Sequence, residues 1–177
     1  MSNQGRILIV DDEQAIRRFL RTSLEAHGYE VDEAGTGQDA LRVAPVARPD
    51  VIILDLGLPD MDGIEVIQKI REWSDVPIVV LSVREREADK IEALDLGADD
   101  YVTKPFGMGE LLARIRTELR HRLREAADEP VITVDELVVD LSKRQVSVRD
   151  ALVKLTPKEY DLLRMLITHA GTVVTHH

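Results

Sequence analysis

Residues 51–63 read Val-Ile-Ile-Leu-Asp-Leu-Gly-Leu-Pro-Asp-Met-Asp-Gly, an apolar run that ends at a carboxylate and passes into a turn-forming segment. Four consecutive apolar residues predict a strand that is covered on both faces, as in parallel sheets. Asp55 directly follows this strand, so we expect its side chain at the carboxyl edge of a sheet, where open α/β sheets bind ligands. The stretch therefore predicts both the type of sheet and the place of the functional site.

Similar apolar runs recur through residues 1–124 and alternate with segments of helical spacing. Pro45 is expected to end or kink the second helical segment. Strands separated by helices of this length are typical of βαβ units, so the sequence predicts a doubly wound α/β domain with a five-stranded parallel sheet. The expected strands are 6–10, 30–34, 51–54, 77–81 and 101–103, and the expected helices are 14–27, 38–47, 64–73, 86–96 and 109–123.

Four further residues with reactive side chains also follow predicted strands. Asp11 and Asp12 come after the first strand, Ser82 after the fourth and Lys104 after the fifth. The carboxyl ends of parallel strands share one edge of the sheet, so these residues should converge with Asp55. Three carboxylates this close repel one another unless a cation neutralises them, and Mg²⁺ prefers oxygen ligands. Acids, a hard cation and one lysine predict phosphoryl transfer.

Each group has an expected role in that chemistry. Asp55 could attack phosphorus and become an aspartyl phosphate. The carbonyl of Gly57 could complete the ligands of Mg²⁺, and Ser82 could donate its hydroxyl to the phosphoryl group. Lys104 would pair with the phosphoryl oxygens as a point charge. A cis peptide bond before Pro105 would direct Lys104 across the site.

Taken singly, these residues have simpler interpretations. Asp12 or Glu13 could be no more than a helix cap, and Ser82 could also be a cap. Asp55 could be an ordinary turn residue, and Lys104 could be an ordinary solvated side chain. Their shared position at the ends of strands in one sheet favours the site.

Composition limits the class of protein. The chain has 177 residues, a net charge of −10 and no cysteine, which excludes disulfides and thiolate metal sites. The net charge argues against nucleic-acid binding by the chain taken whole, although residues 131–177 carry six basic and six acidic residues and are neutral. No apolar run approaches the roughly 18 residues of a membrane helix, and the first residues lack a signal-peptide pattern. We expect a soluble cytoplasmic protein without membrane contact.

The pattern changes after a short polar stretch, residues 125–130, which we interpret as a linker. Strands are expected at 131–139, 145–148 and 152–154. Thr156, Pro157 and Glu159 then predict the start of a helix with a capping box, and Gly171 predicts its end. A small sheet and one helix are rarely stable alone, so we expect this module to be truncated. The sequence does not decide whether His176-His177 is native.

With these residues in place, residues 5–124 resemble the phosphoacceptor receiver domain of two-component response regulators. The resemblance implies a flavodoxin-like fold with strand order 2-1-3-4-5. It also implies that a sensor histidine kinase phosphorylates Asp55. The matching motifs are Ile-Leu-Ile-Val-Asp-Asp-Glu (7–13), Ile-Leu-Asp-Leu-Gly-Leu-Pro-Asp-Met-Asp-Gly (53–63), Val-Val-Leu-Ser (79–82) and Gly-Ala-Asp-Asp-Tyr-Val-Thr-Lys-Pro-Phe (97–106).

The resemblance also assigns roles within the site. Asp12, Asp55 and the Gly57 carbonyl would bind Mg²⁺ directly, and Asp11 would act through water. Ser82 and Tyr101 would form a switch pair, and Lys104 would bind the phosphoryl group. From the residues alone, a tyrosine such as Tyr101 is more often half-buried packing than a switch.

Residues 131–177 resemble the start of the winged-helix DNA-binding domain of the OmpR/PhoB subfamily, through Leu-Thr-Pro-Lys-Glu-Tyr-Asp-Leu-Leu (155–163). The recognition helix and wing of that domain are not among them, so promoter DNA is expected as a partner of the full-length protein only. Within the subfamily, residues 12–21, 55–60 and 71–77 are most similar to regulators of potassium-transport operons.

The resemblance further implies homodimerisation on phosphorylation, through the fourth helix, fifth strand and fifth helix. The alternative is an ordinary solvated surface with an exposed leucine. The expected apolar patch is Ile91, Leu94 and Leu112, with Lys90, Asp99, Asp100, Glu110, Arg114 and Arg120 as candidate ion pairs around it.

Two other functions are alternatives. A Mg²⁺-dependent phosphatase working through an aspartyl phosphate usually has a general acid two residues after its nucleophile, but that residue is Gly57 here. A module that binds partners without phosphorylation would not need Asp12, Asp55, Ser82 and Lys104 together. We therefore expect self-phosphorylation from a phosphodonor and slow autodephosphorylation, and not a turnover enzyme.

Overall fold

The computed structural model describes residues 4–128, 131–141 and 143–168. It divides the chain into two compact units, Met1–Arg120 and His121–His177. Each unit is described by itself below.

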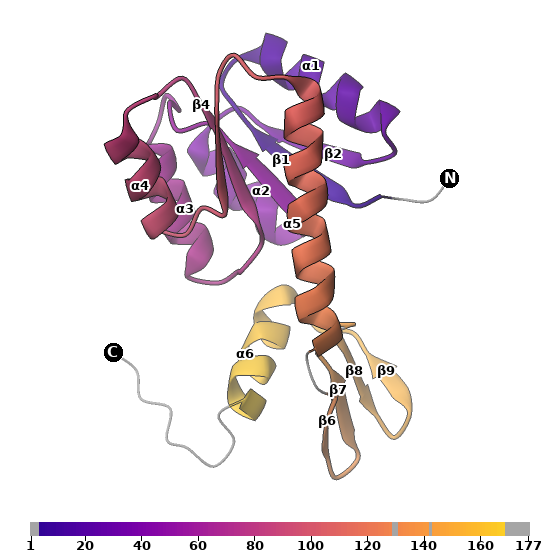
Figure 1. Cartoon of the computed structure of the whole chain (residues 1–177). Helices are drawn as coiled ribbons and strands as arrows, with labels where there is room; N and C mark the ends of the chain where they lie inside the picture. Colours follow the sequence, from indigo (N-terminus) through magenta and orange to yellow (C-terminus); the bar gives the residue numbers. More distant parts are fainter. Residues whose placement is uncertain (1–3, 129–130, 142, 169–177) are drawn as a thin grey trace. The chain divides into compact units, whose positions relative to one another are not determined.

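The first unit is a five-stranded parallel sheet between two layers of helices. The sheet order is β2-β1-β3-β4-β5, which confirms the predicted flavodoxin-like topology. Helices α1 and α5 cover one face of the sheet, and α2, α3 and α4 cover the other (Figure 1). The strands are β1 (Arg6–Val10), β2 (Glu30–Ala34), β3 (Val51–Leu54), β4 (Ile78–Ser82) and β5 (Asp100–Thr103), and the helices are α1 (Gln14–Ala26), α2 (Gly37–Ala47), α3 (Gly63–Arg71), α4 (Glu87–Asp95) and α5 (Met108–Asp128).

The continuous apolar runs follow from the two covered faces. In β1, Leu8 and Val10 pack in the cluster with α2 and α3, whereas Ile7 and Ile9 pack in the cluster with α1 and α5. Successive side chains of a strand point to opposite faces, so a strand covered on both sides has apolar residues at consecutive positions.

Strand register brings the ends of the strands together. Val10 pairs with Leu54 across β1 and β3, and the backbone N–H of Asp55 donates to the Val10 carbonyl at 2.8 Å. Beside them, the N–H of Lys104 donates to the Ser82 carbonyl at 2.8 Å. The residues that follow β1, β3, β4 and β5 therefore lie along one edge of the sheet.

The second helix ends where the sequence predicted, and the fifth is longer than predicted. Pro45, expected to end or kink its helix, lies inside α2, which continues to Ala47 and ends where Arg48 adopts a positive φ of 49°. Helix α5 continues past residue 123 to Asp128, so residues 125–128 of the predicted linker are helical. The division between the two units falls within α5.

The second unit contains an antiparallel sheet in the order β6-β7-β8-β9, and helix α6. The strand predicted at 131–139 is wrong: Asp135, with a positive φ of 52°, turns the chain, and Val134 pairs with Leu137 in a tight hairpin. Gly171 and His176-His177 lie outside the described residues. The elements are β6 (Val131–Val134), β7 (Leu137–Asp140), β8 (Gln145–Val148), β9 (Ala151–Val153) and α6 (Pro157–Thr168).

The start of α6 confirms the predicted capping box. The N–H of Thr156 donates to Glu159 at 2.7 Å, and the N–H of Glu159 donates to the Thr156 hydroxyl at 3.4 Å. These hydrogen bonds lower the pKa of Glu159. Tyr160 then packs with Val139, Leu141 and Val146 in a small core. In the parts of the chain that the structure describes, no helix is long and apolar enough to cross a membrane.

Candidate functional site

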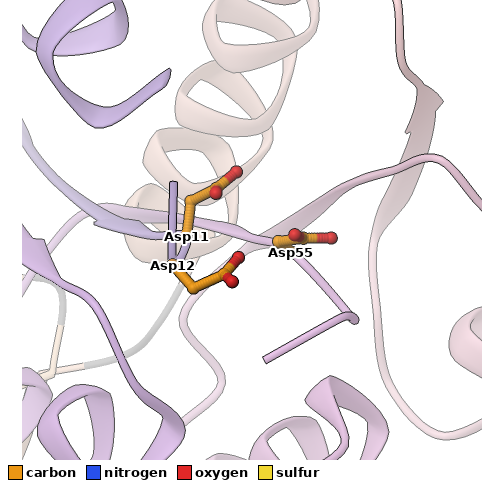
Figure 2. A group of neighbouring side chains, drawn as sticks. All are labelled: Asp11, Asp12 and Asp55. Atoms are coloured by element: carbon orange, nitrogen blue, oxygen red, sulfur yellow. The ribbon is translucent and has the colours of Figure 1, made fainter. Parts of the chain in front are cut away.

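Three carboxylates gather where β1 and β3 end. Carboxylate oxygens of Asp11, Asp12 and Asp55 all lie within 4.8 Å of one another. Figure 2 shows the three side chains side by side, with Asp11 and Asp12 on one segment and Asp55 on the other. The sequence predicted this convergence from the positions of the strands alone.

The backbone turns after each strand fix two of these carboxylates. Asp11 is buried and accepts the N–H of Glu13 at 2.9 Å, and Asp55 accepts the N–H of Gly57 at 3.2 Å. Asp12 is exposed. Glu13 is the residue at the N-cap of α1, and its side chain makes no capping hydrogen bond. Asp12 is not the N-cap residue of α1, and the Glu13 side chain does not cap the helix.

Lys104 reaches the same cluster from the end of β5. Its ammonium lies 2.8 Å from Asp11 and 3.4 Å from Asp55, and its side chain is 8% exposed. Burial alone would lower the pKa of Lys104, but the hydrogen bond to Asp11 and the charges of Asp55 and Asp11 outweigh it and raise that pKa above its usual value. The peptide bond between Lys104 and Pro105 is cis, as expected.

The donor set fits a hard divalent cation. All three side chains offer only carboxylate oxygens, and one lysine cannot balance three negative charges. Mg²⁺ binds oxygen ligands of this kind and keeps several waters, which the exposed side of Asp12 leaves room for.

Ser82 and Tyr101 are linked through the residue Arg84. The Ser82 hydroxyl is buried and accepts the N–H of Arg84 at 3.2 Å, and the Tyr101 hydroxyl donates to the Arg84 carbonyl at 2.8 Å. Partial burial raises the pKa of Tyr101. The side chain of Arg84 also pairs with Asp62 at 3.0 Å. This loop therefore ties the end of β4 to β5 and to the start of α3.

Sequence reasoning missed two residues that hold the segment after Asp55. Asp60 accepts the backbone N–H groups of Gly37 and Gln38, both at 2.8 Å. At Gly63, an added Cβ would lie 2.6 Å from the Cα of Leu56. The sequence places Asp60 in a turn and Gly63 at the start of a helix, but neither contact has a local signal.

An apolar groove of about 520 Å³ adjoins the carboxylates beside Lys104. Phe19 is 53% exposed, and its ring lies 6.4 Å from that of Phe106. The groove is lined by Glu13, Ala15, Ile16, Phe19, Val83, Lys104, Pro105 and Phe106.

The expected dimer face needs one correction. Ile91 and Leu94 are 50% and 43% exposed on α4, but Leu112 is 6% exposed and belongs to the core. It lies one turn before Ile115 on the face of α5 that packs on the sheet, so it cannot form a surface patch with them. In α4, which the structure describes throughout, Ala93 is the one buried side chain.

Most of the charged residues predicted to form ion pairs around this face have partners within the chain. Asp99 pairs with Arg71 at 2.9 Å. Arg114 pairs with Asp100 at 2.8 Å and with Glu110 at 3.0 Å. The Lys90 ammonium lies 5.8 Å from the centre of the Tyr101 ring. Arg120 is exposed.

Comparison with known proteins gives a consistent result. The family model described as "Response regulator receiver domain" matches residues 7–116. The KDP operon transcriptional regulatory protein KdpE of Escherichia coli is 54% identical over 169 residues, which cover 96% of this chain and 75% of that protein. KdpE of Staphylococcus aureus is 42% identical, with 98% and 75% covered.

Solved structures agree with the sequence relatives. The Francisella response regulator 1452 receiver domain has a TM-score of 0.64 and 33% identity, and the match covers 67% of this chain and 98% of that one. A response regulator receiver domain protein from Methanospirillum hungatei has a TM-score of 0.66 and 30% identity, with 70% and 99% covered.

Proposed function

Because the chain belongs to the response regulator receiver family and is KdpE-like, we propose that it is a phosphorylation switch whose phosphoacceptor is Asp55. The observation that carries this proposal is the cluster of Asp11, Asp12 and Asp55 with Lys104 at one edge of the sheet. Receiver domains of this family are not turnover enzymes. The phosphodonor in the cell is a sensor histidine kinase.

The transfer step moves one phosphoryl group between two side chains. A carboxylate oxygen of Asp55 forms a bond to phosphorus while the bond from phosphorus to the kinase histidine nitrogen breaks, and the imidazole leaves neutral after taking up a proton. The oxygens of Asp12, Asp55 and Gly57, with Asp11 acting through water, would hold Mg²⁺, which neutralises charge and orients the phosphoryl oxygens.

Lys104 remains charged at neutral pH, because its neighbouring carboxylates raise its pKa. It lies close enough to Asp55 to pair with the new phosphoryl oxygens. The Ser82 hydroxyl, now bonded to the N–H of Arg84, would turn to the same oxygens. The carbonyl of Arg84 also accepts the Tyr101 hydroxyl, so a change at Ser82 reaches Tyr101 and the surface of α4, β5 and α5.

We assign the output to transcription. The curated relatives are named as transcriptional regulators, and E. coli KdpE as a regulator of the KDP operon. The proposed divisions are a receiver domain (1–124), a linker (125–130) and a winged-helix part (131–177). We assign promoter recognition, at an operon for potassium uptake, to a complete winged-helix domain and not to the described sheet and α6 alone.

Intact mass and light scattering test the switch. With acetyl phosphate and Mg²⁺, the chain should gain one phosphoryl group. EDTA should abolish that gain, because without a cation the negative carboxylates repel the negatively charged phosphoryl donor. Mg²⁺ and beryllofluoride should shift the chain from monomer to dimer. Ile91→Glu should still be phosphorylated but stay monomeric, whereas the matched exposed substitution Val46→Glu on α2 should dimerise normally. Phosphorylation without dimerisation of the wild type would reject the dimer mechanism alone.

The groove beside Lys104 is where we place the kinase. A phosphohistidine must reach Asp55, so its protein has to rest on the adjoining surface, and exposed aromatic side chains are common anchors of such contacts. Phe19→Ala should slow phosphotransfer from the kinase by roughly tenfold, the effect of losing one aromatic anchor. Phosphorylation by acetyl phosphate should not change, because that donor needs no protein contact.

Each variant is assayed twice, once with the phosphorylated kinase and once with acetyl phosphate as donor. Val46→Ala, which removes an exposed apolar side chain outside the groove, should behave as wild type in both. Equal slowing of Phe19→Ala with both donors would mean that Phe19 supports the site itself and not the kinase contact.

A further inference from the structure

The loop from Asp55 to Asp62 carries half of the candidate metal site, and it is attached to a helix that contributes no ligand. Both carboxylate oxygens of Asp60 accept backbone N–H groups at the start of α2, from Gly37 and Gln38. These two hydrogen bonds lower the pKa of Asp60, and the bond from Gln38 has the larger effect. The carboxylate is therefore charged at neutral pH. A charged acceptor at a helix N-terminus is a favourable arrangement.

Packing reinforces this attachment. An added Cβ at Gly37 would lie 2.4 Å from the Cγ of Met61, so the loop rests directly on the α2 backbone. Leu58 packs against the core beneath α2 and α3. Pro59 has a fixed φ, which leaves little freedom between Asp60 and Gly57. A shift of Asp60 would therefore be passed on to Gly57.

The same region also supports the other half of the site. The Arg17 guanidinium donates to the carbonyl of Asp11 at 2.6 Å. It lies against Gly35, where an added Cβ would be 3.3 Å from its Nη1. Gly35 precedes Thr36, the N-cap of α2. The turn between β2 and α2 thus lies against the loop that carries Asp55 and, through the Arg17 side chain, is linked to the segment that carries Asp11.

We propose that Asp60 is a positioning residue for the metal site. By holding the loop on the N-terminus of α2, it sets where Asp55 and the Gly57 carbonyl lie relative to Asp11 and Asp12, and so sets the affinity for Mg²⁺. This inference rests on the proposed function. Groups that orient metal ligands without touching the metal commonly govern affinity in this way.

Titration calorimetry with Mg²⁺ tests the proposal on the whole chain. Asp60→Ala should raise the Kd for Mg²⁺ roughly tenfold, a typical loss when such a supporting group is removed. In phosphorylation by acetyl phosphate, its half-saturating Mg²⁺ concentration should rise similarly. Asp60→Asn, which keeps one acceptor oxygen in place, should fall between Asp60→Ala and wild type.

Thr36→Ala is the matched control. The Thr36 hydroxyl accepts the N–H of Asp39 at 3.0 Å, so this variant also removes an acceptor from the start of α2 but leaves the loop untouched. Both variants should lower Tm by about 2–4 °C. Only Asp60→Ala should weaken Mg²⁺ binding.

Three outcomes are decisive. An unchanged Kd in Asp60→Ala, or an equal change in Thr36→Ala, would overturn the positioning role while leaving the phosphorylation switch intact. Absence of Mg²⁺ binding by the wild type would instead reject the proposed function on which the inference rests.

Discussion

Asp55→Asn should abolish phosphorylation completely. The amide has no anionic oxygen to attack phosphorus, and it cannot serve as a charged ligand of Mg²⁺. The asparagine side chain would keep nearly the same volume as that of Asp55 beside Lys104 and Gly57, so the fold should persist. Intact mass after incubation with acetyl phosphate and Mg²⁺ should show one added phosphoryl group in the wild type and none in the variant.

Asp32→Asn provides a matched control for this result. Asp32 is an aspartate of β2 that pairs with Arg6 at 3.7 Å, outside the carboxylate cluster, and its variant should be phosphorylated like the wild type. Circular dichroism should show the same fold in all three proteins. A stable phosphoryl group on the Asp55→Asn chain would move the phosphoacceptor to another residue and contradict the proposed chemistry.

Gly63→Ala should strongly destabilise the first unit. The added Cβ would lie 2.6 Å from the Cα of Leu56 and 2.7 Å from the carbonyl oxygen of Asp55, and neither backbone atom can move without shifting the segment that carries Asp55. Overpacking of this kind costs about 3 kcal/mol. Thermal unfolding should therefore show a Tm lower by roughly 10 °C. Phosphorylation by acetyl phosphate should slow even below that Tm.

Gly109→Ala tests whether the effect comes from the close approach. Nothing lies within 4 Å of a Cβ added at Gly109, which is in the first turn of α5. Alanine favours a helix over glycine by about 1 kcal/mol, so this variant should have an equal or higher Tm. Equal losses in the two variants would mean that backbone freedom, and not the contact with Leu56, explains the result.

The position of the carboxylates could be predicted because it depends on chain order and strand direction alone. Asp11, Asp55 and Lys104 each follow a strand, and parallel strands end at one edge. Apolar runs without alternation also predicted that both faces of the sheet are covered. These signals are local, and the topology turns them into proximity.

The contacts that support the site could not be predicted in this way. Asp60 reaches the N-terminus of α2 across 23 positions of sequence, and only the packed structure decides which N–H groups it meets. The burial of Leu112 depends on how α5 is rotated against the sheet. The turn at Asp135 was missed because Val131–Val139 is apolar enough to pass for one strand.

Helix α4 has a thermodynamic consequence for the switch. Its single buried side chain, Ala93, anchors it through one methyl group, worth about 0.8 kcal/mol of transfer free energy. To shift a two-state equilibrium from a ratio of 1:99 to 99:1, a ligand must favour one state by about 5.5 kcal/mol of binding free energy. Because α4 buries so little apolar surface, the hydrophobic cost of moving it would be only a small part of that free energy, and the core of the sheet would not need to rearrange.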